Sequence, residues 1–87
     1  MSYALELAPK ARQGLGRLEI WLQEETLDEL EKIAENPQLL RRRRESQAVF
    51  DFTRVHDSGF HYVFLEVEPR DEQQVLFVLT VGHFVRR

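Results

Sequence analysis

The spacing of apolar residues changes once along this chain, and the change limits the folds that it can adopt. Before Asn36, leucines and alanines recur every three or four residues, as on one face of a helix. After Ala48, aromatic and β-branched residues gather in segments typical of strands. Because helices come first and linked strands follow, the pattern predicts an α+β layer architecture within one domain.

A short strand and a helix are expected in the first 24 residues. Tyr3–Leu7 alternates between larger apolar and other side chains, which predicts a strand that Pro9 ends. An apolar stripe follows at spacings of four, three and four, formed by Ala11, Leu15, Leu18 and Leu22. The stripe predicts a helix over residues 9–24, which Gly14 and Gly16 weaken by about 1 kcal/mol each relative to alanine.

A second helix is expected over residues 27–35. Thr26 and Glu29 have the spacing of a capping box, in which two side chains satisfy free amides at a helix start. The alternative is a single bent helix. The Asn36-Pro37 pair ends the helical half, because the residue before a proline avoids helical angles.

Three strands are expected after a polar connector at residues 38–46. They cover Ala48–Val55, Phe60–Val67 and Val75–Val81, with turns at residues 57–59 and 69–74. The last strand, VLFVLTV, is apolar on both faces, so we expect it inside the sheet. The predicted order is β-α-α-β-β-β. The N-terminal strand and helical hairpin would pack on one face of a small, mostly antiparallel four-stranded sheet, leaving the other face open.

Charge is divided unevenly along the chain. Its net charge is −3, but residues 18–36 hold seven acids and one base, a net of −6, which leaves +3 elsewhere. That surplus is mostly in Arg41–Arg44, Arg86 and Arg87. The overall acidity argues against tight general binding to nucleic acid, which depends on neutralising phosphates. The acidic helix is a solvated face or a surface that keeps RNA away from the helical side.

Several features predict one cytoplasmic domain covering residues 1–87. The chain has no cysteine for disulfides or thiolate metal sites. The start MSYALELAPK lacks the basic and apolar segments of a signal peptide. The longest apolar run is far shorter than the roughly 20 residues that cross a bilayer, so we expect no membrane contact.

Four segments together resemble the RelE/ParE superfamily of bacterial toxins from type II toxin–antitoxin systems. LAPKARQGLGRL is similar to the family's first strand-to-helix segment, and LDELEKIAENP to the end of its second helix. DSGFHYVFLEV is similar to its turn and third strand, and VLTVGHFVRR to its final strand. The segments follow the family's order, and ENP is closer to the RelE branch.

The resemblance implies a toxin that a cognate antitoxin neutralises. RelE-branch members are ribosome-dependent endonucleases that cut mRNA, whereas ParE-branch members inhibit DNA gyrase. Cleavage by the RNA 2′-hydroxyl needs a base, positive charge for the phosphate and an acid. In the RelE branch, basic residues and a tyrosine on the open sheet face supply these functions.

By matching positions, the resemblance assigns these roles to three catalytic candidates, Arg54, His61 and His83. The two histidines suit proton transfer because their pKa lies near neutrality, whereas arginine hardly deprotonates. Tyr62 should face the opposite side from His61, because side chains alternate along a strand. The RNA phosphates would be met by Arg41, Arg42, Arg43, Arg44, Arg86 and Arg87.

Two departures from the family pattern keep a non-catalytic alternative open. Phe84 stands where an arginine is common, and no aromatic residue follows Arg87. The alternative is a binding module of the same fold, either a ParE-like gyrase inhibitor or a toxin that has lost its chemistry. A further alternative is a small α+β interaction domain with no toxin role.

Simple structural roles are also open for the singled-out residues. His61 and His83 could be surface or structural histidines, and His56 is expected to be solvated. Trp21 and the six phenylalanines are most simply core residues. A metal site built from His56, His61 and His83 is an open alternative. We expect no cofactor and no metal, because no carboxylate or histidine spacing is characteristic of a zinc site.

The arginine run Arg41–Arg44 has no interleaved aromatics for base stacking, so it is not expected to recognise sequence. By its position it is a solvated connector, or a phosphate-contacting margin if the toxin interpretation holds. Any such contact would weaken strongly with added salt.

Overall fold

The computed structural model describes residues 2–40, 48–57 and 59–86 of the chain. Its elements are β1 (Ala4–Leu7), α1 (Pro9–Gly16), α2 (Ile20–Glu35), η1 (Pro37–Leu40), β2 (Ala48–His56), β3 (Gly59–Arg70) and β4 (Val75–Arg86). The strands form one sheet in the order β1-β4-β3-β2, with β1 parallel to β4 and the other neighbours antiparallel. The predicted order, the mostly antiparallel sheet and the inner position of the last strand are confirmed.

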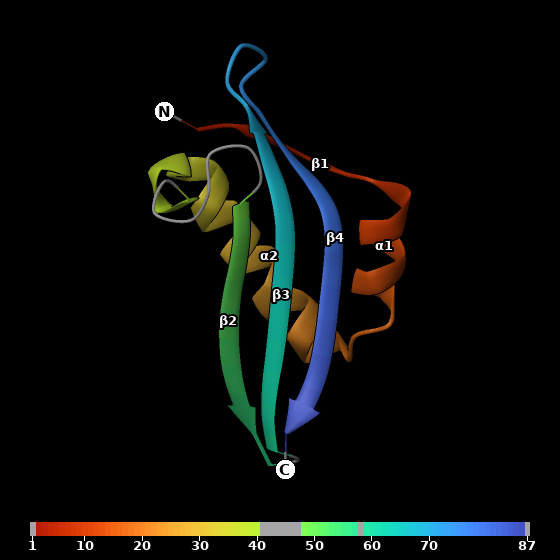
Figure 1. The fold of residues 1–87 in the computed structure, drawn as a ribbon. Helices are drawn as coiled ribbons and strands as arrows, with labels where there is room; N and C mark the ends of the chain where they lie inside the picture. Colours follow the sequence, from red (N-terminus) through yellow and green to blue (C-terminus); the bar gives the residue numbers. More distant parts are fainter. Residues whose placement is uncertain (1, 41–47, 58, 87) are drawn as a thin grey trace.

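Both helices pack on one face of the sheet, which we call the helix-covered face. Figure 1 shows α2 crossing behind β2 and β3, while α1 lies beside β4. In β3 every second residue from His61 to Val67 is buried, and the residues between them are partly or fully exposed. The second face, the open face, carries no helix among the described residues, as the sequence predicted.

The core lies between α2 and the inner strands. Leu22, Leu30 and Ile33 of α2 are completely buried, as are Leu65 of β3 and Leu76 of β4. Each such side chain contributes about 1.5–3 kcal/mol when it leaves water. This packing fixes α2 against the middle of the sheet.

A register shift in β4 decides which of its residues face the helices. Val67 pairs with Val78 but Glu66 pairs with Thr80, so β4 holds one extra residue at this point. An extra residue reverses the alternation of side chains beyond it. Residues before and after the shift are therefore both buried, and His83 lies on the helix-covered face.

The predicted boundary between the helices is wrong. The first helix ends at Gly16 and the second begins at Ile20, not after Thr26. Thr26 is fully buried inside α2, and its Oγ1 donates a hydrogen bond to the Leu22 carbonyl at 2.7 Å, so it caps nothing. Two glycines weaken the helix where the break occurs.

Gly14 is required by close packing. A Cβ at this position would meet the Val81 carbonyl oxygen, with the Val81 Cβ at 3.2 Å. Glycine alone lets the α1 backbone lie this near to β4. The predicted apolar stripe is buried or packed against the core on both sides of the break: Ala11, Leu15, Leu18 and Leu22.

The strands are longer than the sequence predicted. β3 continues through Pro69 to Arg70, and β4 reaches Arg86, where the prediction ended at Val81. The connector begins with η1, while residues 41–47 lie outside the described ones. Neither described α-helix combines the length and hydropathy that a bilayer span needs. The extension of β4 brings His83 into the sheet.

Candidate functional site

Four rings gather on the helix-covered face at one end of the sheet, and we call them the histidine cluster. They are Trp21 of α2, His56 of β2, His61 of β3 and His83 of β4. The strand register brings them together, because His83 pairs with Val63, two residues beyond His61 and on the same side. The sequence predicted His61 and His83 in one site and left a metal site of His56, His61 and His83 open, but it did not place Trp21 beside them.

His61 and His83 are in direct hydrogen-bond contact. His61 Nδ1 lies 3.1 Å from His83 Nε2, and the two ring planes are parallel at 0°. The ring centroids are 5.3 Å apart, which exceeds the N–N distance by about the width of one imidazole. The rings therefore meet edge to edge within a plane, which is the geometry of an N–H···N bond and not of stacking.

The two histidines differ in exposure. His61 is only 3% exposed, whereas His83 is classed as exposed. The interpretation of His61 as a plain surface histidine is therefore wrong. A proton on this pair can pass between a buried nitrogen and one at the surface, because one ring must donate and the other accept.

Trp21 connects the other members of the cluster. Its ring stacks on His56 with centroids 4.5 Å apart and an interplanar angle of 18°, and it meets His61 edge-on at 5.0 Å. Its Nε1 donates a hydrogen bond of 2.6 Å to Glu19 Oε2. The residue just before α2 thus places a carboxylate beside the cluster.

The pKa of His83 lies below its ordinary value of 6.5. The largest cause is partial burial of the ring, followed by repulsion from His61, while Glu19 acts in the opposite direction. Burial and a neighbouring positive charge both disfavour an imidazolium. His83 is therefore neutral at pH 7 and able to accept a proton.

Arg54 lies on the helix-covered face, where α2 neutralises its charge. Its Nε donates to Glu25 Oε2 at 2.8 Å, and its Nη2 donates to Glu29 Oε1 at 2.7 Å. The side chain also lies 5.3 Å from the Phe52 ring centroid. The acidic helix predicted as a solvated surface thus provides specific partners for this arginine.

The face expected for the three catalytic candidates is wrong. Arg54, His61 and His83 lie together, but on the helix-covered face and not on the open one. For His83, the cause is the register shift in β4, which turns its side chain to the helix-covered face. Tyr62 faces away from His61, as predicted.

The predicted phosphate-binding arginines are not all described. Arg86 is exposed and pairs in the sheet with Phe60 of the open face, away from His61. Arg41–Arg44 and Arg87 lie outside the described residues. Their expected role stays a prediction.

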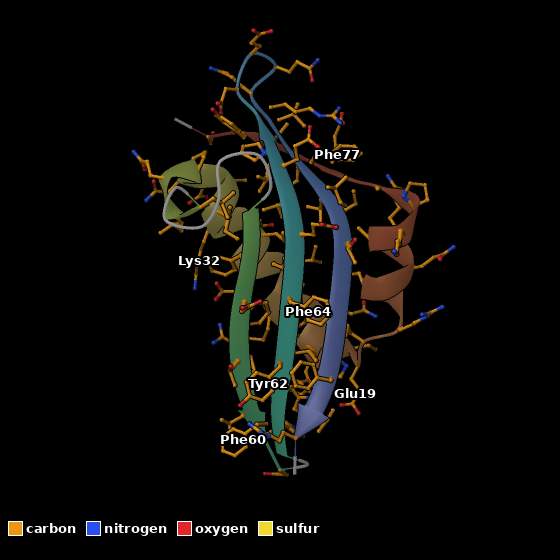
Figure 2. The ribbon with its side chains drawn as sticks, in the orientation of Figure 1. Glu19, Lys32, Phe60, Tyr62, Phe64 and Phe77 are labelled. Carbon is orange, nitrogen blue, oxygen red and sulfur yellow. The ribbon has the colours of Figure 1, made fainter. Side chains whose placement is uncertain are left out.

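The open face is aromatic. Figure 2 shows Phe60, Tyr62 and Phe64 projecting from the near side of β3. Tyr62 and Phe84 stack with centroids 5.0 Å apart. Phe60, Phe64 and Phe84 are 49%, 39% and 54% exposed, so the expectation that the phenylalanines are core residues is wrong for these three. Among the described residues, Phe52 alone of the six phenylalanines is buried, at 9% exposure.

Trp21 and Glu19 were not predicted as part of a site. No sequence motif marks them, since Trp21 looked like a core residue and Glu19 like one acid among seven. Their position follows from α2 starting at Ile20, a boundary that the sequence prediction missed.

The cluster does not have the arrangement of a metal centre. Among the described residues, no three histidine, cysteine, aspartate or glutamate side chains converge as metal ligands. His61 Nδ1 and His83 Nε2 point at each other, not toward a common third position. Proton transfer is the chemistry that this geometry suits.

Comparison with known proteins identifies a family. A family model described as the ParE toxin of the type II toxin–antitoxin system parDE matches residues 5–86, nearly the whole chain. No curated protein sequence matches the chain.

Solved structures share the fold. The isolated Escherichia coli RelE toxin is 22% identical, with a TM-score of 0.73 over 99% of this chain and 88% of that one. The E. coli RelBE toxin–antitoxin complex is 22% identical, with a TM-score of 0.66 over 98% and 100% of the two chains. The RelBE2 complex from Mycobacterium tuberculosis is 14% identical, with a TM-score of 0.66 over 97% and 100%.

Proposed function

Because this chain belongs to the ParE toxin family of type II toxin–antitoxin systems, we propose that it is a toxin restrained by a cognate antitoxin protein and that it cleaves mRNA on the ribosome. The observation that carries the proposal is the direct contact between His61 and His83. Two similar folds were solved together with antitoxins, which supports such a partner here. A ribosomal target implies action in the cytoplasm.

The imidazole pair supplies both proton transfers of RNA cleavage. Neutral His83 takes the proton from a ribose 2′-hydroxyl while the 2′-oxygen attacks phosphorus. Its Nε2 faces His61, so its other nitrogen, Nδ1, is the one that would meet the substrate. The bond from phosphorus to the 5′-oxygen breaks, and the protonated pair returns the proton to that oxygen. The products are a 2′,3′-cyclic phosphate and a 5′-hydroxyl.

The negative charge on the phosphate needs cations from outside the histidine cluster. Arg54 is bound by Glu25 and Glu29, so it contributes only if substrate displaces a carboxylate. Arg86 and the arginines of residues 41–44 and 87 are the proposed phosphate contacts. Contacts of this kind weaken steeply with salt.

Induced expression in a bacterium lacking the antitoxin tests the proposal. The wild-type protein should arrest growth and produce transcript fragments with 5′-hydroxyl ends, and co-expressed antitoxin should prevent both. The double change His61→Ala and His83→Ala should abolish cleavage, while Thr53→Val, on the opposite side of β2, serves as the matched control. Uncut transcripts with soluble wild-type protein present would count decisively against the proposed nuclease.

The second candidate is a non-catalytic toxin, such as a ParE-like inhibitor of DNA gyrase. It is favoured by the neutralised Arg54 and by the aromatic, sparsely charged end of the open face. Growth arrest that survives the double histidine change, together with inhibition of DNA supercoiling by purified gyrase, would establish this candidate in place of RNA cleavage.

A further inference from the structure

One carboxylate in the site has no place in the proposed chemistry. Glu19 precedes α2, and its Oε2 accepts the 2.6 Å hydrogen bond from Trp21 Nε1. Figure 2 shows Glu19 beside the end of β4 that carries His83. Trp21 is itself fixed by the stack on His56 and the edge contact with His61. The acid is therefore held next to the pair by a side chain that belongs to the cluster.

Charges from every neighbouring element surround the imidazole pair. β2 supplies His56 and Arg54, and β3 and β4 supply the pair itself. From α2, Glu25 and Glu29 are both bound to Arg54. Among the described residues, the remaining acid that acts on His83 is Glu19, which favours its protonated form.

We propose that Glu19 is a positioning residue for the imidazole pair. Its carboxylate, anchored by Trp21, stabilises the proton that His61 and His83 share. The catalytic meaning of this role depends on the proposed RNA cleavage. The electrostatic role can be measured without any substrate.

The charge balance explains why such an acid is needed. When the pair takes up a proton, one imidazolium lies against a second ring at 3.1 Å, in a partly buried place that disfavours positive charge. Without an opposite charge, the pair would be a weaker base toward a hydroxyl. Glu19 offsets this weakness without touching the substrate.

Glu19→Gln is the sharpest test. The glutamine oxygen can still accept the hydrogen bond from Trp21, while the charge is lost. Histidine ring signals followed by NMR through a pH titration should show the His83 midpoint falling below its wild-type value. Glu35→Gln removes one exposed carboxylate at the far end of α2 and is the matched control, with no expected change.

Salt and a second variant separate electrostatics from packing. The difference between wild type and Glu19→Gln should shrink in 1 M salt, where the screening length is about 3 Å. Trp21→Phe keeps an aromatic ring against His56 but removes the donor. Its His83 midpoint should lie between those of wild type and Glu19→Gln.

Activity gives a separate readout. The acid limb of the pH–rate profile should move to lower pH in Glu19→Gln, and the rate at pH 7 should fall, because the pair becomes a weaker base. An unchanged His83 midpoint in Glu19→Gln would overturn the role of Glu19. An inactive wild type with the expected midpoint shift would instead overturn the nuclease and leave the electrostatic role intact.

Discussion

The two faces of β3 differ in almost every property although they share one backbone. On the helix-covered face, His61 is buried and bonded to His83, and Arg54 of the adjacent strand is held by two acids. On the open face, one residue further along, Tyr62 and Phe84 stack at the surface. At this end of the sheet, side-chain alternation therefore separates a hydrogen-bonded histidine pair from exposed aromatic side chains.

The difference between the two faces shows how this fold accommodates titratable side chains. Polar side chains under the helices are fixed in position because each needs a partner when water is removed. The aromatic side chains Phe60, Phe64 and Phe84 on the open face are 39% to 54% exposed, so their substitution removes less buried surface. Paired substitutions, one on each face, should reveal this contrast in measured stability.

The largest contrast is expected between two glycines. Gly14→Ala should destabilise the protein by roughly 2 kcal/mol or more, because the new methyl meets the Val81 backbone, which cannot move easily. Gly82→Ala should cost less than about 1 kcal/mol, because its methyl meets only the ring of Phe64, which can turn into solvent. Urea unfolding measures both. Equal losses would show that the two faces are equally rigid.

A second contrast compares aromatic residues. Trp21→Ala removes the ring that packs on His56, His61 and the core, and should cost about 2–3 kcal/mol. Phe84→Ala removes a side chain that is 54% exposed and should cost about 1 kcal/mol or less. Thermal unfolding gives both values. A larger loss for Phe84 would mean that the open face contributes to the fold more than its exposure indicates.

A third contrast compares ion pairs. Arg54→Gln removes the nearer of two cations from Glu29, whose side chain is 13% exposed and keeps Lys32 at 3.4 Å. The change also breaks the pair with Glu25 and should cost about 1–2 kcal/mol. Arg70→Gln breaks the exposed pair with Glu68 on the other face and should change stability by about 0.5 kcal/mol or less. Chemical denaturation of both variants in low and high salt is the measurement. Similar costs would indicate that Arg54 is as well solvated as Arg70.

The smallest effect concerns pH. Because the folded-state pKa of His83 is lowered by burial and by His61, protonation favours the unfolded chain. Its contribution to stability is complete above the unfolded value of 6.5 and is lost as the pH falls through the folded value. His83→Gln should flatten the change in melting temperature between pH 7.5 and pH 5. A slope unchanged by this substitution would assign the dependence to other groups.

Part of the candidate site could be predicted from the sequence. Spacing and resemblance selected Arg54, His61 and His83, and the structure does bring these three together. Their face was mispredicted. For His83 the extra residue in β4 decides the face, and it leaves no mark in an apolar run such as VLFVLTV. Glu19 and Trp21 were missed because the glycines, and not Thr26, end the first helix.

The sequence by itself determined the α+β class, the order of elements, the inner position of β4 and most of the core. These depend on the periodicity of apolar residues, which is a local property of the chain. Tertiary structure alone decided the edge-to-edge imidazole pair, the capture of Arg54 by Glu25 and Glu29, and the exposure of the open-face aromatics. Each of these depends on strand register and on which face α2 covers, and residues distant in sequence set both.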